Sequence, residues 1–202
     1  MLKKIITSPS FMLLIAANLY CIWYYQNHPN GLATIIWIYW LQSVIIGLFN
    51  FADLLTIKNF DAGSMKLNDA PITEKNKGCL PWFFLVHYGG FHAGYFVFLL
   101  IGFDLRQVDT NFLLIGVAAF IAEALWSYIK RKQVEQEVQL SIGTLFFLPY
   151  LRVVPMHLMI LLPKFTGIPT SMVFLVLKMS ADLLTYIFTM HLYSKSKTVG
   201  ME

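Results

Sequence analysis

Six apolar stretches, each about long enough to cross a bilayer, divide this chain and decide what it can fold into. A membrane-spanning helix needs about 20 mostly apolar residues, and it satisfies every backbone hydrogen bond internally. Only 13% of the 202 residues are charged, against about 25% in an ordinary soluble domain. We therefore predict an all-α membrane bundle, a single domain over residues 1–202. The six predicted transmembrane helices cover about 5–25, 32–57, 80–103, 111–129, 142–162 and 168–191.

The basic residues gather on one side of this predicted topology. Eleven of them lie on the side that holds both termini and the 58–79 loop, and only Arg106 and Lys164 lie on the other. Because Lys and Arg are enriched in cytoplasmic loops, we predict that both termini are cytoplasmic and that the protein is a multi-pass protein of the cell inner membrane. The net charge of +4 then reflects topology, and we expect membrane lipids rather than nucleic acid as partners. The eleven are Lys3, Lys4, Lys58, Lys66, Lys75, Lys77, Lys130, Arg131, Lys132, Lys195 and Lys197.

Two segments on the basic side differ in their predicted order. The 58–79 loop holds Gly63, Pro71 and Gly78 among mixed charges, so we expect a mobile cytoplasmic loop. Residues 130–139 are polar but favour helix, and they should extend the fourth span into the cytosol.

The two cysteines, Cys21 and Cys79, lie near opposite faces of the membrane in this topology, so we expect two free thiols.

Three charged residues fall near the middle of predicted spans. Each such charge costs roughly 2.5–3.5 kcal/mol on insertion scales, so it is expected to face a partner or a cavity. Lys178 and Asp182 have i, i+4 spacing and share a helix face, and Arg152 lies at the centre of the fifth span. The pair is either a structural pair that neutralises itself, or Asp182 also serves Arg152 or a histidine and leaves one cation to hold an anionic group. Arg152, Lys178 and Asp182 are therefore the candidate catalytic residues.

Residues 87–92, His-Tyr-Gly-Gly-Phe-His, form the most distinctive string. On a regular helix His87 and His92 point about 140° apart, so they meet one ligand only if Gly89 and Gly90 break or widen the turn. The string is compatible with two histidines bonded to neighbouring helices at a tight crossing, with a shared metal or catalytic site, or with a proton relay.

The fifth span carries Pro149 and Pro155 on either side of Arg152. Proline removes a backbone donor and disrupts a helix interior, and irregular backbone at membrane depth is tolerated where it is buried in protein or lines a cavity. We therefore predict a broken helix that forms a cavity wall with Arg152 and His157. We further predict that His92, Arg152 and Asp182 converge within about one bridging water, joined by His87 or His157.

Four strings together resemble a family of uncharacterised bacterial integral membrane proteins of unknown function. They are residues 39–50, 87–92, 152–157 and 178–191, and the resemblance implies no established activity. The histidine string also looks like part of a rhomboid protease, but the Gly-x-Ser-Gly string of that family is absent. The asparagine expected four residues after His92 is Phe96.

Three functions remain open from the sequence. The leading one is a metal-dependent membrane-embedded enzyme for a lipid or another hydrophobic substrate, in which His87, His92 and His157 bind a divalent metal such as zinc. Asp182 would be a fourth ligand or an orienting group, and Arg152 and Lys178 would stabilise a phosphate or an oxyanion. The second is a small proton-coupled or anion carrier. The third is a non-catalytic membrane component whose buried polar residues fix helix packing.

Overall fold

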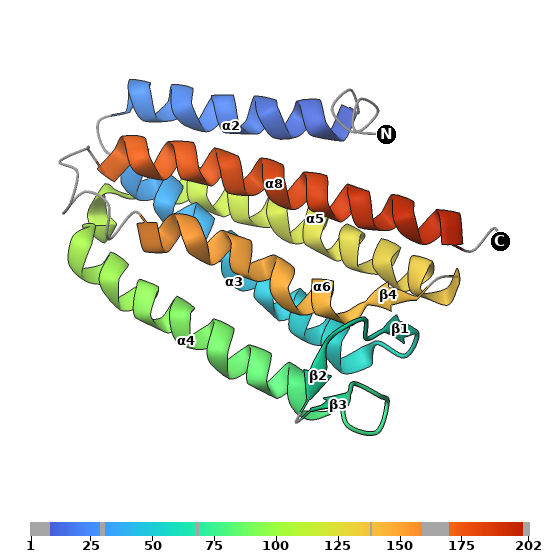
Figure 1. The fold of residues 1–202 in the computed structure, drawn as a ribbon. Helices are drawn as coiled ribbons and strands as arrows, with labels where there is room; N and C mark the ends of the chain where they lie inside the picture. Colours follow the sequence, from blue (N-terminus) through green and yellow to red (C-terminus); the bar gives the residue numbers. More distant parts are fainter. Residues whose placement is uncertain (1–8, 29–30, 68, 138, 159–169, 200–202) are drawn as a thin grey trace.

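The chain is mostly helical, and its long helices lie side by side along one direction (Figure 1). The computed structural model describes residues 9–28, 31–67, 69–137, 139–158 and 170–199. Each predicted span coincides with helix in these ranges. The helices labelled in Figure 1 are α2 (Pro9–Asn27), α3 (Gly31–Thr56), α4 (Cys79–Gly102), α5 (Thr110–Glu137), α6 (Ile142–Phe147) and α8 (Thr170–Val199). Residues 153–158 are also helical.

Three of the described helices, α3, α4 and α5, are long and apolar enough to cross a membrane. These three support a membrane location. The last two turns of α5 are polar and remain helical to Glu137, so the predicted extension beyond the fourth span is confirmed as helix.

Helix α3 is the centre of the bundle, and α4 and α5 pack most extensively against it. Its most buried face repeats every three or four residues as Tyr39, Ser43, Gly47, Asn50 and Leu54, the spacing of one helix face. A Cβ atom on Gly47 would lie 2.5 Å from the Tyr88 ring of α4. Glycine at this position therefore lets the tyrosine ring rest directly on the α3 backbone.

The loop between α3 and α4, which the sequence predicted to be mobile, contains three short strands. Strand β1 (Phe60–Asp61) pairs in parallel with β4 (Leu140–Ser141), and β2 (Lys66–Leu67) pairs antiparallel with β3 (Ala70–Pro71). The β1–β4 pairing joins this loop to the segment after α5. Loop composition alone could not indicate such a partner, because the pairing strands are about 80 residues apart in the sequence.

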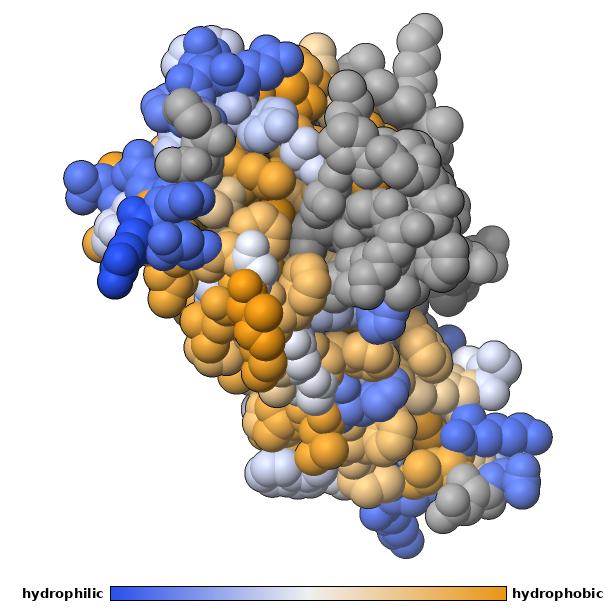
Figure 2. Space-filling view, turned by 90° about the vertical axis from the view of Figure 1, so that its left-hand side faces the viewer, coloured by the Kyte–Doolittle hydropathy of each residue, from blue (hydrophilic) through white to orange (hydrophobic). Residues whose placement is uncertain are grey.

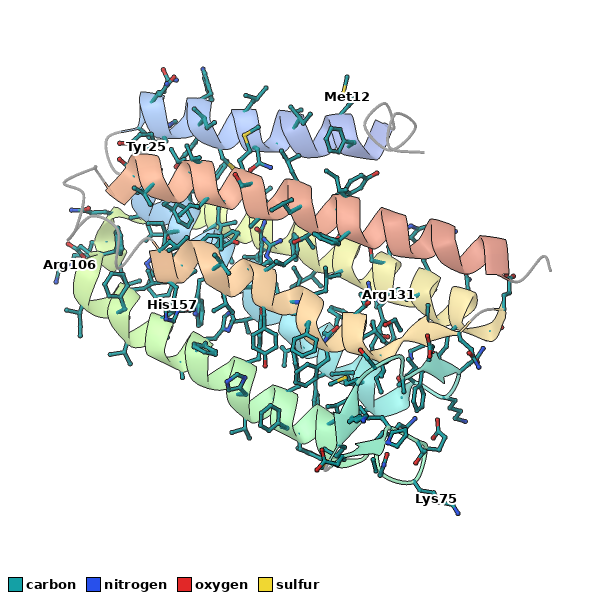
Figure 3. All side chains as sticks on the ribbon, in the orientation of Figure 1. Met12, Tyr25, Lys75, Arg106, Arg131 and His157 are labelled. Atoms are coloured by element: carbon teal, nitrogen blue, oxygen red, sulfur yellow. The ribbon has the colours of Figure 1, made fainter. Side chains whose placement is uncertain are left out.

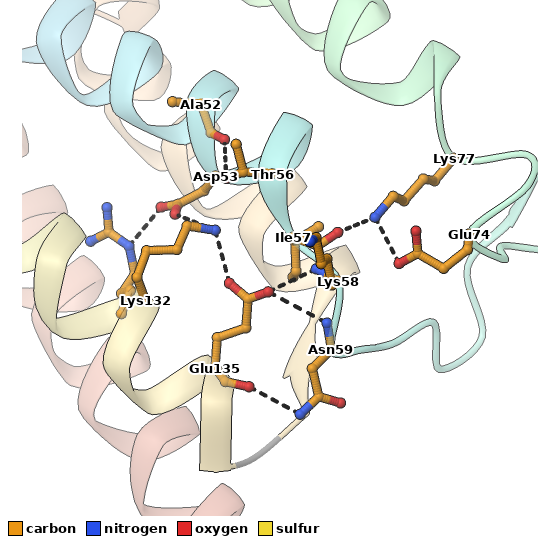
Figure 4. A network of polar contacts seen from close by, with 11 residues as sticks. Ala52, Asp53, Thr56, Ile57, Lys58, Asn59, Glu74, Lys77, Lys132 and Glu135 are labelled. Atoms are coloured by element: carbon orange, nitrogen blue, oxygen red, sulfur yellow. Dashed lines mark hydrogen bonds and ion pairs between the residues drawn. The ribbon is translucent and has the colours of Figure 1, made fainter.

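A network of ion pairs and hydrogen bonds links the elements at the end of the bundle that bears the β-strands (Figure 4). The buried Asp53 of α3 lies 2.7 Å from Arg131 Nε and 3.5 Å from Lys132 Nζ of α5. Glu135 accepts hydrogen bonds from Lys132 Nζ at 2.8 Å and from the backbone N–H of Lys58 at 2.7 Å. Burial tends to raise the pKa of Glu135. The Lys132 ammonium and the backbone N–H groups of Lys58 and Asn59 outweigh this effect and hold that pKa below its ordinary value. The network links α3, α5 and the loop.

At the opposite end of the bundle, hydrogen bonds of a single residue, Asp109, join three helices. Asp109 accepts from the backbone N–H of Phe112 at 3.0 Å and from the Tyr24 hydroxyl at 3.1 Å, and its backbone N–H donates to Thr34 Oγ1 at 3.0 Å. These bonds join α2, α3 and the start of α5. In the view onto this end, hydrophobic residues cover much of the surface between separate hydrophilic patches (Figure 2).

Candidate functional site

Asp182 sits between two cations in the interior of the bundle. Its Oδ1 atom lies 3.1 Å from Arg152 Nη1, and its Oδ2 atom lies 2.8 Å from Lys178 Nζ. The exposed fractions of the three residues are between 6% and 8%. The pair predicted from i, i+4 spacing is therefore part of a triad, and Asp182 serves Arg152 as well as Lys178. We call Arg152, Lys178 and Asp182 the ion triad.

Neutral side chains from two further helices complete the surroundings of Arg152 and Lys178. Arg152 Nη2 donates to Gln42 Oε1 at 3.2 Å, and its Nε donates to Ser43 Oγ at 3.4 Å. Lys178 Nζ donates to Asn18 Oδ1 at 3.0 Å. The Tyr39 ring lies 4.7 Å from the Arg152 guanidinium carbon and 5.8 Å from Lys178 Nζ. Helices α2, α3 and α8 thus meet the helical segment 142–158 at one polar centre.

The predicted broken helix is confirmed, and it presents Arg152 to this centre. Helix α6 ends at Phe147, the five residues Leu148–Arg152 form the 3-10 helix η2, and residues 153–158 return to α-helix. Pro149 stands at the start of η2, where its missing N–H and fixed φ are tolerated. A 3-10 stretch of this length inside a helix is uncommon and often marks a functional hinge. The Tyr39 hydroxyl donates to the Arg152 carbonyl at 3.3 Å and holds η2 against α3.

Positive charge exceeds negative charge at the triad. Among the described side chains, Asp182 is the only carboxylate within ion-pair distance of Arg152 or Lys178. Glu123 of α5 acts on Arg152 only from beyond ion-pair distance; it is exposed and accepts from Ser127 Oγ at 2.6 Å. With Arg152 and Lys178 charged, the described triad has a net charge of +1.

The two histidines of the 87–92 string lie on an unbroken helix, so the break at Gly89 and Gly90 that a shared ligand would need is not present. Helix α4 runs through both glycines, and a Cβ atom on either would meet nothing within 4 Å. These glycines therefore neither widen the turn nor permit a close helix crossing. His92 is buried and His87 is exposed.

Each of the three predicted metal ligands is bonded to a different group. His92 Nδ1 lies 2.9 Å from the Tyr88 carbonyl oxygen; because a carbonyl only accepts, this nitrogen carries the proton. His87 Nδ1 lies 2.9 Å from the Tyr150 hydroxyl. His157 Nδ1 bonds to the Tyr95 hydroxyl, and Figure 3 places it between α4 and the helical stretch 153–158.

The structure does not support the predicted metal site. No group of three or more His, Cys, Asp or Glu among the described residues is placed to hold a metal ion. Among the residues that the structure describes, none of these histidines makes a hydrogen bond or ion pair with Arg152 or Asp182. The Tyr88 hydroxyl, on the residue whose backbone carbonyl His92 contacts, donates at 3.0 Å to the carbonyl of Ser43.

The tyrosines around η2 were not singled out from the sequence. Besides Tyr39 and Tyr88, the Tyr95 hydroxyl donates to the Val153 carbonyl at 3.3 Å, and Tyr150 stands within η2 itself. Tyr88 and Tyr95 are seven residues apart and share a face of α4, a spacing that could have indicated them. Their hydroxyls bond to backbone carbonyls on either side of η2, at Ser43 of α3 and at Val153.

One protein family matches nearly the whole chain. The model of DUF6498, a family of unknown function, matches residues 1–199. The comparisons with curated proteins and with solved structures found no match.

Proposed function

We propose, for a chain that belongs to the DUF6498 family of unknown function, that the ion triad binds a small anion within the membrane and that the protein carries this anion across the bilayer. The observation that carries the proposal is the excess of cations at the triad. Two buried cations face one described carboxylate, and an uncompensated buried charge is strongly unfavourable. A bound monovalent anion would neutralise the site.

The donors at the triad suit an anion. Arg has five N–H donors and Lys has three. The contacts described above occupy three donors of Arg152 and two of Lys178. The remaining donors, together with the positive charge, fit the oxygens of a carboxylate or an inorganic oxyanion. Membrane lipids then surround the protein as solvent and are not required as substrate.

The carrier is favoured over an enzyme by what surrounds the cations. Hydrolysis of a lipid needs a nucleophile or an activated water held by a base. The described residues bring neither a metal site nor a base–nucleophile pair to Arg152 and Lys178. A carrier needs only a binding site and an element that can change conformation, and η2 interrupts the fifth span beside Arg152.

The proposal includes six crossings with both termini in the cytoplasm. Successive helices run in alternating directions, and the start of α2 and the end of α8 lie at the same end of the bundle (Figure 1). Lys75 and Arg131 lie toward that end, and Arg106 lies at the other (Figure 3). This distribution fits the enrichment of basic residues on the cytoplasmic side and supports an inner-membrane location.

Flux into proteoliposomes tests the carrier. Chloride, nitrate, acetate and phosphate would be offered in turn to vesicles that contain the wild type, Lys178→Arg or Lys178→Met. We expect uptake of at least one anion with the wild type and Lys178→Arg and none with Lys178→Met, which retains the Arg152–Asp182 pair without the excess charge. Equal uptake with Lys178→Met, or no uptake of any of the four, contradicts the carrier.

A further inference from the structure

The buried face of α3 carries polar residues from the ion triad to the charged network at the end that bears the β-strands. Ser43 contacts Arg152, and Asp53 contacts Arg131 and Lys132. Asn50 lies on this face between them, and all three α3 residues are buried. The rise of a helix separates Ser43 from Asp53 by about 15 Å. Ser43 and Asp53 are paired with cations, as buried polar groups at this depth usually are, which leaves Asn50 to be explained.

The side-chain nitrogen of Asn50 lacks a hydrogen-bond acceptor among the described residues. The exposed fraction of Asn50 is 8%. A buried donor without an acceptor is costly, so a group with lone pairs is expected beside it. An anion supplies such lone pairs, and the amide N–H groups supply the matching donors.

Tyr88 separates Asn50 from the triad. Its ring rests on Gly47, one turn from Ser43 and one turn from Asn50, and its hydroxyl donates to the Ser43 carbonyl at 3.0 Å. Phe84 stacks against the Tyr88 ring with centroids 5.0 Å apart. An anion that moves along this face of α3 would meet the Tyr88 ring before it reached Arg152.

We propose that Asn50 is a second binding position for the same anion, on a route along α3 that starts at the Asp53 end, and that Tyr88 closes the route between Asn50 and Arg152. This inference rests on the proposed anion carrier and assigns it an entry path. The start of the route holds two cations, Arg131 and Lys132, which are paired with the carboxylates of Asp53 and Glu135. Passage requires the Tyr88 ring to leave Gly47 and its hydroxyl to release Ser43.

Thiol labelling along α3 tests the route. Ser43→Cys and Asn50→Cys are made separately in a Cys21→Ser, Cys79→Ser background, and an anionic methanethiosulfonate bearing a sulfonate is applied to either face of membrane vesicles. We expect Asn50→Cys to react from the face that bears the β-strands and Ser43→Cys to react slowly. Adding Tyr88→Phe should raise the Ser43→Cys rate about fivefold, through the loss of one hydrogen bond, and Tyr88→Ala should raise it more.

Phe84→Ala is the matched control, because it removes a buried ring beside Tyr88 but leaves the Tyr88 ring on Gly47. It should raise the Ser43→Cys rate less than Tyr88→Ala does. Equal rates in the two variants, or an Asn50→Cys thiol that reacts no faster than Ser43→Cys, overturns the route. A cationic methanethiosulfonate of similar length tests the preference for anions separately from the closure by Tyr88. If it reacts as fast as the anionic reagent while the Tyr88 effect remains, the anion preference fails and the Tyr88 closure stands.

Discussion

Asp182 of α8 and Arg152 of η2 lie 3.1 Å apart, and this contact joins an intact helix to the interrupted helical segment 142–158. The second carboxylate oxygen of Asp182 is held by Lys178 one turn away on the same helix. One carboxylate thus stabilises two buried cations that come from different elements. The stability of the bundle and the charge of its centre both depend on it.

Removing the charge of Asp182 should destabilise the protein more than removing that of Lys178. Asp182→Asn leaves two buried cations without a carboxylate, and the free energy of unfolding should fall by about 3–5 kcal/mol. Lys178→Met keeps one cation and one anion and should cost less. Unfolding in detergent, followed by heat and by denaturant, provides the comparison. Equal losses in the two variants would show that Asp182 is not the shared counter-ion.

The close contact between Gly47 and Tyr88 predicts a clear difference between two glycines. Gly47→Ala places a methyl group 2.5 Å from the Tyr88 ring, and such overpacking typically costs about 1–3 kcal/mol. Gly94→Ala is the control, because a Cβ atom there meets nothing within 4 Å and alanine favours helix. Thermal unfolding should show a lower midpoint for Gly47→Ala and an unchanged or higher one for Gly94→Ala. The packing of Tyr88 on Gly47 is refuted if both variants match the wild type.

The network at the β-strand end predicts an acid-sensitive stability. The pKa of Glu135 is lowered in the folded protein, so its contribution is present above the ordinary glutamate pKa and is lost as pH falls through the lower folded value. Glu135→Gln should therefore remove part of the stability loss in this acid range. The unfolding midpoint is measured against pH, with the exposed Glu137→Gln as control. A Glu135→Gln profile that falls as steeply as that of the wild type would argue against this linkage.

The proposed topology predicts the side from which two exposed positions can be labelled. Cys79 is exposed at the start of α4, and Thr110 is exposed at the start of α5. In intact cells, an impermeant maleimide should miss Cys79 and should label Thr110→Cys in a Cys79→Ser background. Inverted membrane vesicles should give the opposite result for Cys79. Labelling of Cys79 from outside would reverse the orientation.

The sequence predicted the helices well because their signals are local. Apolar stretches and their flanking turns located the helices, and Pro149 and Pro155 indicated the interruption around Arg152. The i, i+4 spacing placed Lys178 beside Asp182. Each of these inferences needs only neighbouring residues.

The partners from distant segments could not be predicted in this way. Which residues share the triad depends on how α2, α3, η2 and α8 rotate against one another, and composition does not specify these rotations. The same limit explains the histidines, because membrane depth does not say which face of α4 or η2 a residue occupies. The β1–β4 pairing likewise depends on where α5 ends relative to α3.

The most direct test of the account measures whether small anions stabilise the protein through the excess charge at the triad. Unfolding temperatures are determined for the wild type and Lys178→Met in chloride, nitrate, acetate and phosphate at matched ionic strength, since a ligand that binds only the folded state raises stability with its concentration. The account predicts that at least one anion raises the midpoint of the wild type as its concentration increases, and that none does so for Lys178→Met. Anions that act equally on both proteins, or on neither, would contradict an anion site at Arg152, Lys178 and Asp182.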